Sequence, residues 1–246
     1  MKKLAFFGIV GFALLLGLST SQAQVLGQYG GFATPMGAPA APSITTPEQV
    51  MLLHHVLSAR RPDFKGIARA SDEYKAANDF DKEKVVDAKV MALRNNYEMT
   101  TAGDKLVVKV PVTVSSFSVR NKGFIINELN DAMNFKYVYS GKNYAFIPLQ
   151  LGEHQWIDAS DDATALAIDK GRGKNNDYML YIFFSPTYAD PPDRMTPLED
   201  GKEYTVMTGS IDHIDLFDAE SKEKLWSNMQ KAAPDPMNDS LLQLKK

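Results

Sequence analysis

The residues best suited to chemistry lie near the C-terminal end, in the stretch HIDLFDAESKEKLW that starts at His213. His213 is flanked by Asp212 and Asp215, and histidine beside carboxylates is the material of acid–base and metal sites. Successive side chains of a strand point to opposite faces. If this stretch is a strand, His213 and Asp215 share one face and Asp212 lies on the other.

The same stretch has a simpler interpretation as a hairpin. We predict a turn at residues 219–222 and a return strand through Trp226, with a short terminal helix as the alternative. The charged side chains would then be a solvated face. No nucleophile or third partner with recognisable spacing follows in the sequence, so His213 and Asp215 remain the only catalytic candidates.

The other three histidines do not form a metal site by their spacing. His54 and His55 are neighbours on a predicted helix and point about 100° apart, whereas a helical zinc pair lies four residues apart. We expect His54 at the margin of the core. His154, in GEHQW, lacks the second histidine of a zinc-protease helix. With no cysteine in the chain, we predict no metal and no cofactor.

The sequence contains neither a phosphate-binding loop nor a serine hydrolase motif. DKGRGKNND lacks the spacing of a phosphate loop and follows a predicted helix, so Gly171, Gly173 and Lys174 are interpreted as a flexible basic connector. The chain has no GxSxG or SxxK motif. Paired carboxylates of a glycosidase cannot be recognised, because their separation is spatial.

A predicted long loop, SPTYADPPDRMTPLEDGK at 185–202, is the best candidate for contact with a partner. Loops of more than about 12 to 15 residues are often functional. Tyr188, Arg194 and Met195 belong to residue types enriched in interfaces, so we name them as binding candidates. The alternative is a proline-stiffened cover that protects a sheet edge.

These residues must be positioned by an α+β fold. Residues 46–98 form the helical part, which begins with Thr46 as N-cap, Pro47 in the first turn and Gln49 completing a capping box. A second long helix follows Asn78 or Asp79 as cap, with an apolar stripe at helical spacing. A short helical piece is expected between the two.

Residues 104–230 form the β-rich part. LVVKVPVTV alternates as a half-buried strand, and Pro111 indicates that this strand lies at a sheet edge or carries a bulge. NFKYVYSGKNYAFIPLQ is typical of a hairpin. A short helix capped by Ser160 precedes YMLYIFF, an apolar run expected to be a central strand. EYTVMTGSIDHIDLFD is a further strand. We therefore predict an N-terminal helical segment packed on an antiparallel β-rich domain.

The start of the chain predicts export from a bacterial cell. Lys2 and Lys3 precede an apolar run at 4–18, and small residues lead to cleavage after Ala23. The run is shorter than the roughly 20 residues of a spanning helix, although an uncleaved anchor is the alternative. We predict a signal peptide (1–23), a Gly/Ala/Pro-rich linker (24–45), one domain (46–230) and a loosely held tail (231–246).

Composition limits the classes of function. The chain has 27 basic and 30 acidic side chains, and loss of Lys2 and Lys3 leaves 25 against 30, a net charge of −5. A nucleic-acid binder would show a concentrated basic face instead. The absence of cysteine excludes a lipid anchor through cysteine, a thiol nucleophile and disulfides. We expect a periplasmic or secreted protein without a membrane span after cleavage.

The segments NDFDKEKVVDAKVMALRNNY, FSVRNKGF and YMLYIFFSP together resemble exported bacterial domains of unknown function. The resemblance covers the chain beyond the linker and implies no activity and no site residue. Two hypotheses follow from the sequence. The first is a non-enzymatic protein that binds an envelope protein or ligand, and the second is a periplasmic hydrolase that uses His213 with carboxylates.

Overall fold

A 16-residue strand, β8 (Glu203–Asp218), is the centre of the fold. In the computed structural model, which describes residues 42–229, β8 lies between an antiparallel neighbour, β6 (Tyr178–Ala189), and a parallel neighbour, β4 (Lys142–Pro148). The short strands β7 (Thr196–Pro197) and β9 (Lys224–Ser227) also pair with it. The hairpin predicted after Asp218 is thus confirmed.

Two further strands form the edges of this sheet, whose order is β1-β6-β8-β4-β3. Strand β1 (Leu106–Val112) pairs with β6, and β3 (Phe135–Tyr139) pairs with β4 through a two-residue turn at Ser140 and Gly141. Both turn residues have positive φ, as a type I′ turn requires. The predicted edge position of the strand that carries Pro111 is confirmed, and so is the central position of YMLYIFF.

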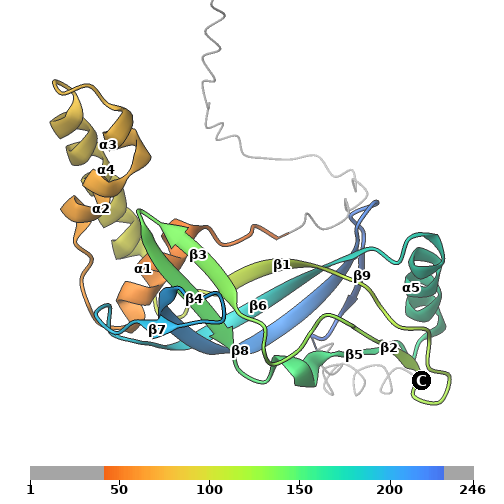
Figure 1. The fold of residues 1–246 in the computed structure, drawn as a ribbon. Helices are drawn as coiled ribbons and strands as arrows, with labels where there is room; N and C mark the ends of the chain where they lie inside the picture. The colour runs from red at the N-terminus through yellow and green to blue at the C-terminus, as the bar shows by residue number, and fades with distance from the viewer. Residues whose placement is uncertain (1–41, 230–246) are drawn as a thin grey trace, which may run out of the picture. The chain divides into compact units, whose positions relative to one another are not determined.

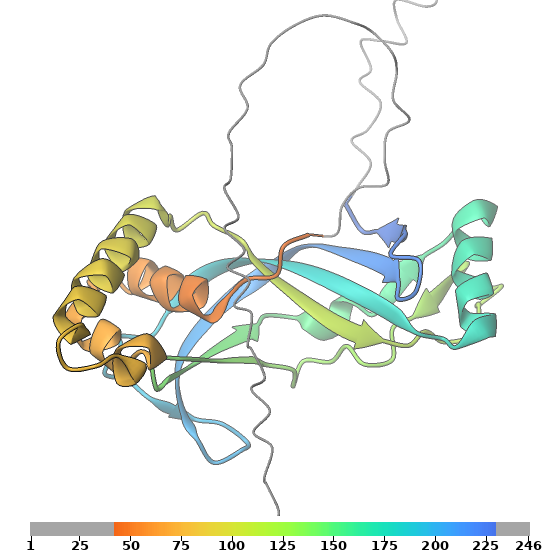
Figure 2. The ribbon, with the colours of Figure 1, turned by 90° about the horizontal axis from the view of Figure 1, so that it is seen from above.

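The helical part has four helices, which lie at one end of the sheet (Figures 1 and 2). Helix α1 (Pro47–Leu57) lies against the sheet, while α2 (Phe64–Ala70), α3 (Asp72–Ala76) and α4 (Lys82–Met99) extend away from it. The predicted capping box is present, because the Thr46 side chain accepts from the Gln49 N–H and the Gln49 side chain accepts from the Thr46 N–H.

A smaller structure lies at the opposite end of the sheet (Figure 1). Strand β2 (Gly123–Ile125) pairs with β5 (Trp156–Asp158), which follows a single 3-10 turn, η1 (Leu151–His154). Helix α5 (Asp162–Lys174) closes this end.

One hydrophobic core joins the helices to the inner face of the sheet. Its side chains include Val50 and Leu53 of α1, Leu93 of α4, and Phe146 and Phe184 of the sheet, all nearly inaccessible to water. Burial of a large apolar side chain contributes about 1.5 to 3 kcal/mol, so this packing fixes α1 against the strands. The α+β prediction is confirmed, with the parallel β4–β8 pair as an unpredicted feature.

Several local predictions were wrong. Residues 185–189 continue β6 instead of opening a long loop, since their main chain pairs with β8. Gly171, Gly173 and Lys174 form the last turn of α5 and are not a flexible connector. Asp161, not Ser160, caps that helix. Helix α2 was not predicted, and α4 starts after Asp81, which makes no side-chain cap, instead of after Asn78 or Asp79.

No helix within residues 42–229 is long and apolar enough to cross a membrane. The predicted signal peptide, almost all of the linker, and the tail lie outside the described residues.

Candidate functional site

The sequence candidate His213 lies at a β-bulge that changes which aspartate it meets. His213 lies opposite Phe183, but Ile211 lies opposite Phe184, so Asp212 is an extra residue on β8. The bulge breaks the strict alternation of side chains. The His213 Nδ1 donates to the Asp212 carboxylate at 2.8 Å, so the prediction that these two side chains point to opposite faces was wrong.

Lys105, just before β1, and Ser185, on β6, join Asp212 and His213 to form a bulge cluster. The Lys105 ammonium donates to Asp212 at 2.7 Å and to the Ser185 hydroxyl at 2.5 Å. These hydrogen bonds, first from Lys105 and then from His213, hold the pKa of Asp212 below its usual value. The His213 ring stacks on Phe183 with centroids 3.9 Å apart.

Asp215 belongs to a different set of contacts. It is buried, accepts a hydrogen bond from the Ser227 hydroxyl at 2.6 Å and lies 2.7 Å from the Lys224 ammonium. The structure therefore gives His213 and Asp215 separate partners, and the predicted pair does not form one acid–base unit.

The bulge cluster has the residue types of a hydrolase but an unfavourable setting. Lys105, in an ion pair with Asp212, is an ammonium without a lone pair to accept the Ser185 proton. About a third of Asp212 and two-fifths of Lys105 remain exposed to water. Lys105 lies at the rim of a hollow between α1, the end of α4 and the start of β1.

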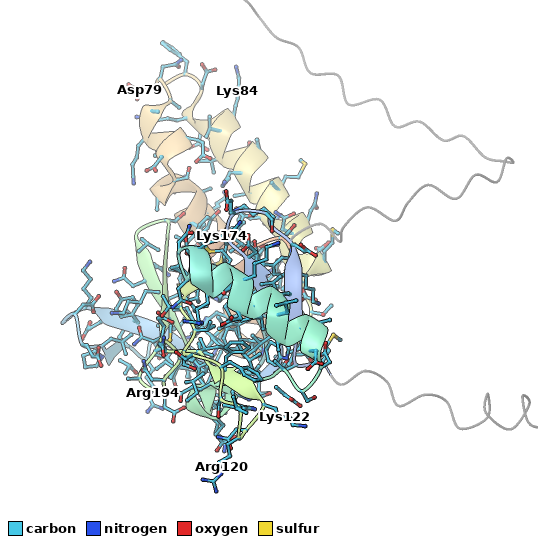
Figure 3. All side chains as sticks on the ribbon, turned by 90° about the vertical axis from the view of Figure 1, so that its right-hand side faces the viewer. Asp79, Lys84, Arg120, Lys122, Lys174 and Arg194 are labelled. Atoms are coloured by element: carbon cyan, nitrogen blue, oxygen red, sulfur yellow. The ribbon has the colours of Figure 1, made fainter. Side chains whose placement is uncertain are left out.

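The binding candidates Tyr188, Arg194 and Met195 gather at the turn between β6 and β7. The Tyr188 hydroxyl donates to the Asp190 carboxylate at 3.0 Å, and the Arg194 guanidinium lies 3.4 Å from the same carboxylate. The Met195 sulfur accepts from the Thr205 hydroxyl at 3.4 Å. Arg194 lies far from the tip of the helical arm, where Asp79 and Lys84 are found (Figure 3). All three candidates are exposed enough to touch a partner.

Beneath this turn lies His54, which is fully buried and not at the core margin as predicted. Neither ring nitrogen has a hydrogen-bond partner of good geometry. The ring makes edge contacts with His55 and Tyr144, each with centroids 5.6 Å apart. Burial, and next the neighbouring His55, lower the pKa of His54 to about 4, although the nearby Asp190 opposes the shift.

A third polar cluster lies where the helices meet the sheet, and Glu48 is its centre. Its carboxylate accepts from the Tyr139 hydroxyl at 2.5 Å and from the Asn96 amide at 2.8 Å. The Lys89 ammonium lies 3.7 Å from the same carboxylate. Burial, together with the hydrogen bond to Glu48, raises the pKa of Tyr139.

Glu48 lines two of three neighbouring hollows, and the three together are called the helix–sheet groove. The first, of about 320 Å³, lies between α1, the end of α4 and the start of β1. A second, of about 600 Å³, shares Glu48, Gln49 and Asn96 with it and reaches Val138 and Tyr139 on β3. The third, of about 440 Å³, continues from β3 to α3 and Lys89. All three hollows are open to solvent, and the second is the shallowest, so the groove is a surface feature suited to a partner that lies along it.

No protein-family model, curated protein or solved structure matches this chain. The resemblance to exported bacterial domains therefore stays an expectation, and interpretation of the sites depends on their geometry. Within residues 42–229, no group of three or more histidine or acidic side chains is arranged to hold a metal ion.

The helix–sheet groove was missed by sequence reasoning. Glu48, Asn96 and Tyr139 are up to 91 residues apart and come from α1, α4 and β3. In the sequence, Glu48 is an ordinary acid in the first turn of a helix, where the helix dipole favours it. Only the packing of α1 against β3 shows that Glu48 also accepts hydrogen bonds from Asn96 and Tyr139.

Proposed function

We propose that this chain is an exported, non-enzymatic binding protein that uses the helix–sheet groove to hold a partner. The observation that carries the proposal is the row of three neighbouring hollows, two of them lined by Glu48 and Asn96 and two by Tyr139. Glu48, Asn96 and Tyr139 are already hydrogen-bonded to one another, so the centre of the groove presents a shaped polar surface.

The turn that carries Tyr188, Arg194 and Met195 is a second contact surface. Its exposed aromatic, guanidinium and thioether groups are of the types enriched at interfaces. The internal bonds to Asp190 hold Tyr188 and Arg194 in place, which lowers the entropy lost on binding.

The alternative is a hydrolase that uses the bulge cluster. It is supported by the proximity of Ser185, Lys105, Asp212 and His213. Against it stand the exposure of Lys105 and Asp212 and the ion pair between them, because catalytic groups are most effective in enclosed, water-poor sites.

Crosslinking capture from a bacterial envelope extract tests the proposal. The mature chain serves as bait, and Glu48→Gln is expected to reduce the yield of the main crosslinked partner, while His213→Gln leaves it unchanged. Both variants are also assayed against ester, amide and glycoside substrates. Turnover by the wild-type chain that His213→Gln abolishes would instead establish the hydrolase.

A further inference from the structure

The two edges of the main sheet differ in how they are covered. At β1, the Thr45 N–H donates to the Val107 carbonyl at 3.0 Å, and the Val107 N–H donates to the Thr45 hydroxyl at 2.7 Å. Pro111 removes a further donor from this edge. At β3, the only strand partner among residues 42–229 is β4.

The hairpin turn determines which main-chain groups of β3 are free. Tyr139 and Lys142 flank the two-residue turn and exchange hydrogen bonds, and such pairs alternate along an antiparallel ladder. The N–H and C=O groups of Lys136 and Val138 therefore point away from β4. No other described residue bonds to them, so they form an unpaired template of the kind that extended peptides use.

The helix–sheet groove lies directly beside this free edge. Val138 and Tyr139 line both the 600 Å³ and the 440 Å³ hollows, with the start of α1 and the side of α4 on the other wall. Val138 is 61% exposed, so an added strand would meet both an open main chain and an apolar side chain.

The charge of the groove favours a cationic side chain in the added strand. The Lys89 ammonium is shared by two carboxylates, at 3.7 Å from Glu48 and 3.5 Å from Glu73. The Glu73 carboxylate accepts hydrogen bonds from the Glu73 main-chain N–H and from the Ser71 hydroxyl. These bonds, and next the positive charge of Lys89, keep the pKa of Glu73 below its usual value. Asp72 is balanced by Lys75, so this wall retains one negative charge.

We propose that an extended segment of a partner protein pairs with the outer edge of β3 and lies in the helix–sheet groove, with one of its Lys or Arg side chains at Glu73. The inference rests on the proposed binding function and names the class of partner. An edge of five residues accommodates a segment of about 17 Å, which is about five residues in extended conformation.

The probe is a displayed library of random linear 12-residue peptides, selected against the complete mature chain. Synthetic versions of the selected peptides are titrated with the wild type and with Val138→Pro, which removes one outward N–H but none of the β3–β4 bonds. The matched control Val138→Ala keeps the N–H. Thermal unfolding of each variant checks that it is folded.

We expect the selected peptides to contain Lys or Arg and to bind Val138→Pro at least about tenfold more weakly than the wild type, since a main-chain bond and strand register are lost. Val138→Ala should change the affinity less than about threefold, because only apolar contact is reduced. Glu73→Gln should weaken binding and lower its salt dependence. Amide exchange at Lys136 and Val138 should slow in the complex, and this readout does not depend on a variant that folds.

Other outcomes would overturn the inference. Unchanged affinity of Val138→Pro with exchange protection around Arg194 would place the peptide at the β6–β7 turn and leave the binding function intact. Self-association that Val138→Pro abolishes would make a second copy the occupant. If no peptide binds but the envelope partner is captured through Glu48, the groove binds a different chemistry. Loss of both capture and peptide binding would contradict the proposed function itself.

Discussion

His54 and His213 are the same residue type in two opposite settings. His54 lies in the core between α1 and the sheet, without a good partner for either nitrogen. His213 lies at a strand bulge, bonded to Asp212 and stacked on Phe183. The sequence separates them poorly, because each is a histidine on a predicted helix or strand and burial depends on how that element packs.

The two histidines differ in how they affect the free energy of unfolding. A buried polar group without a partner costs about 1 to 3 kcal/mol, so His54 weakens the fold at a place where apolar packing is strong enough to tolerate it. His213 has partners for its ring, and its stacking on Phe183 contributes only about 0.5 to 1.5 kcal/mol.

The largest effect expected from this comparison is a loss of stability in acid. The pKa of His54 is about 4 in the fold, against an ordinary value of 6.5. The unfolded chain therefore binds more protons below pH 6.5, and stability is lost as the pH falls from 6.5 to about 4. The linkage amounts to about 3 kcal/mol, measured by urea unfolding across that range.

His54→Leu is the control for this loss. It removes two buried polar atoms and one titrating group, so stability at pH 7 should stay the same or rise by about 1 kcal/mol. The acid slope should become shallower without vanishing, because burial also lowers the pKa of His55. An identical slope in wild type and His54→Leu would show that other groups cause the acid loss.

The second effect tests whether α1 holds His54 in place. Thr46→Ala removes the hydroxyl of the capping box and should cost about 1 kcal/mol. Thr46→Ser keeps the hydroxyl and should retain most of the stability. If α1 needs its cap, amide exchange in the first turns of the helix should also quicken in Thr46→Ala alone.

A smaller effect is expected at His213. His213→Ala removes the ring that stacks on Phe183 at 3.9 Å, which should cost about 0.5 to 1.5 kcal/mol. His213→Phe keeps an aromatic ring and should recover part of the lost stability. A loss above about 3 kcal/mol would mean that the bulge is as important to the fold as the core around His54.

The smallest effect is expected for Asp212→Asn. The ion pair with Lys105 is partly exposed, so after discount for solvent screening it contributes no more than about 0.5 kcal/mol. Because hydrogen bonds lower the pKa of Asp212, the contribution is present above the ordinary carboxyl pKa and disappears as the pH falls through the lowered value. Urea unfolding at low and high salt should show that the difference in stability between the wild type and Asp212→Asn becomes smaller at high salt.

The sequence was sufficient where a local rule decides the structure. Thr46, Pro47 and Gln49 define the start of α1, and Pro111 places its strand at an edge, because each depends on main-chain donors a few residues away. The period of two in β1 and the apolar run of β6 likewise report burial on one or both faces.

The sequence was insufficient where distant segments meet. The bulge at Asp212 arises from the register of β8 against β6, which no pattern within residues 211–215 reveals. Residues 185–189 of the predicted loop are strand for the same reason, since β8 is long enough to pair with them. Glu48 and Tyr139 meet only after α1 packs on the β3–β4 hairpin.

Strand β8 has a consequence for how the chain reaches its final form. It pairs with four strands, yet residues 203–218 are synthesised after all but one of them. The preceding segments lack their common neighbour until then, so the ladder cannot close during most of translation, and such non-local pairing is slow. A chain threaded through a translocation channel as proposed would remain loose enough to pass, and would assemble only when its last fifth emerges on the far side.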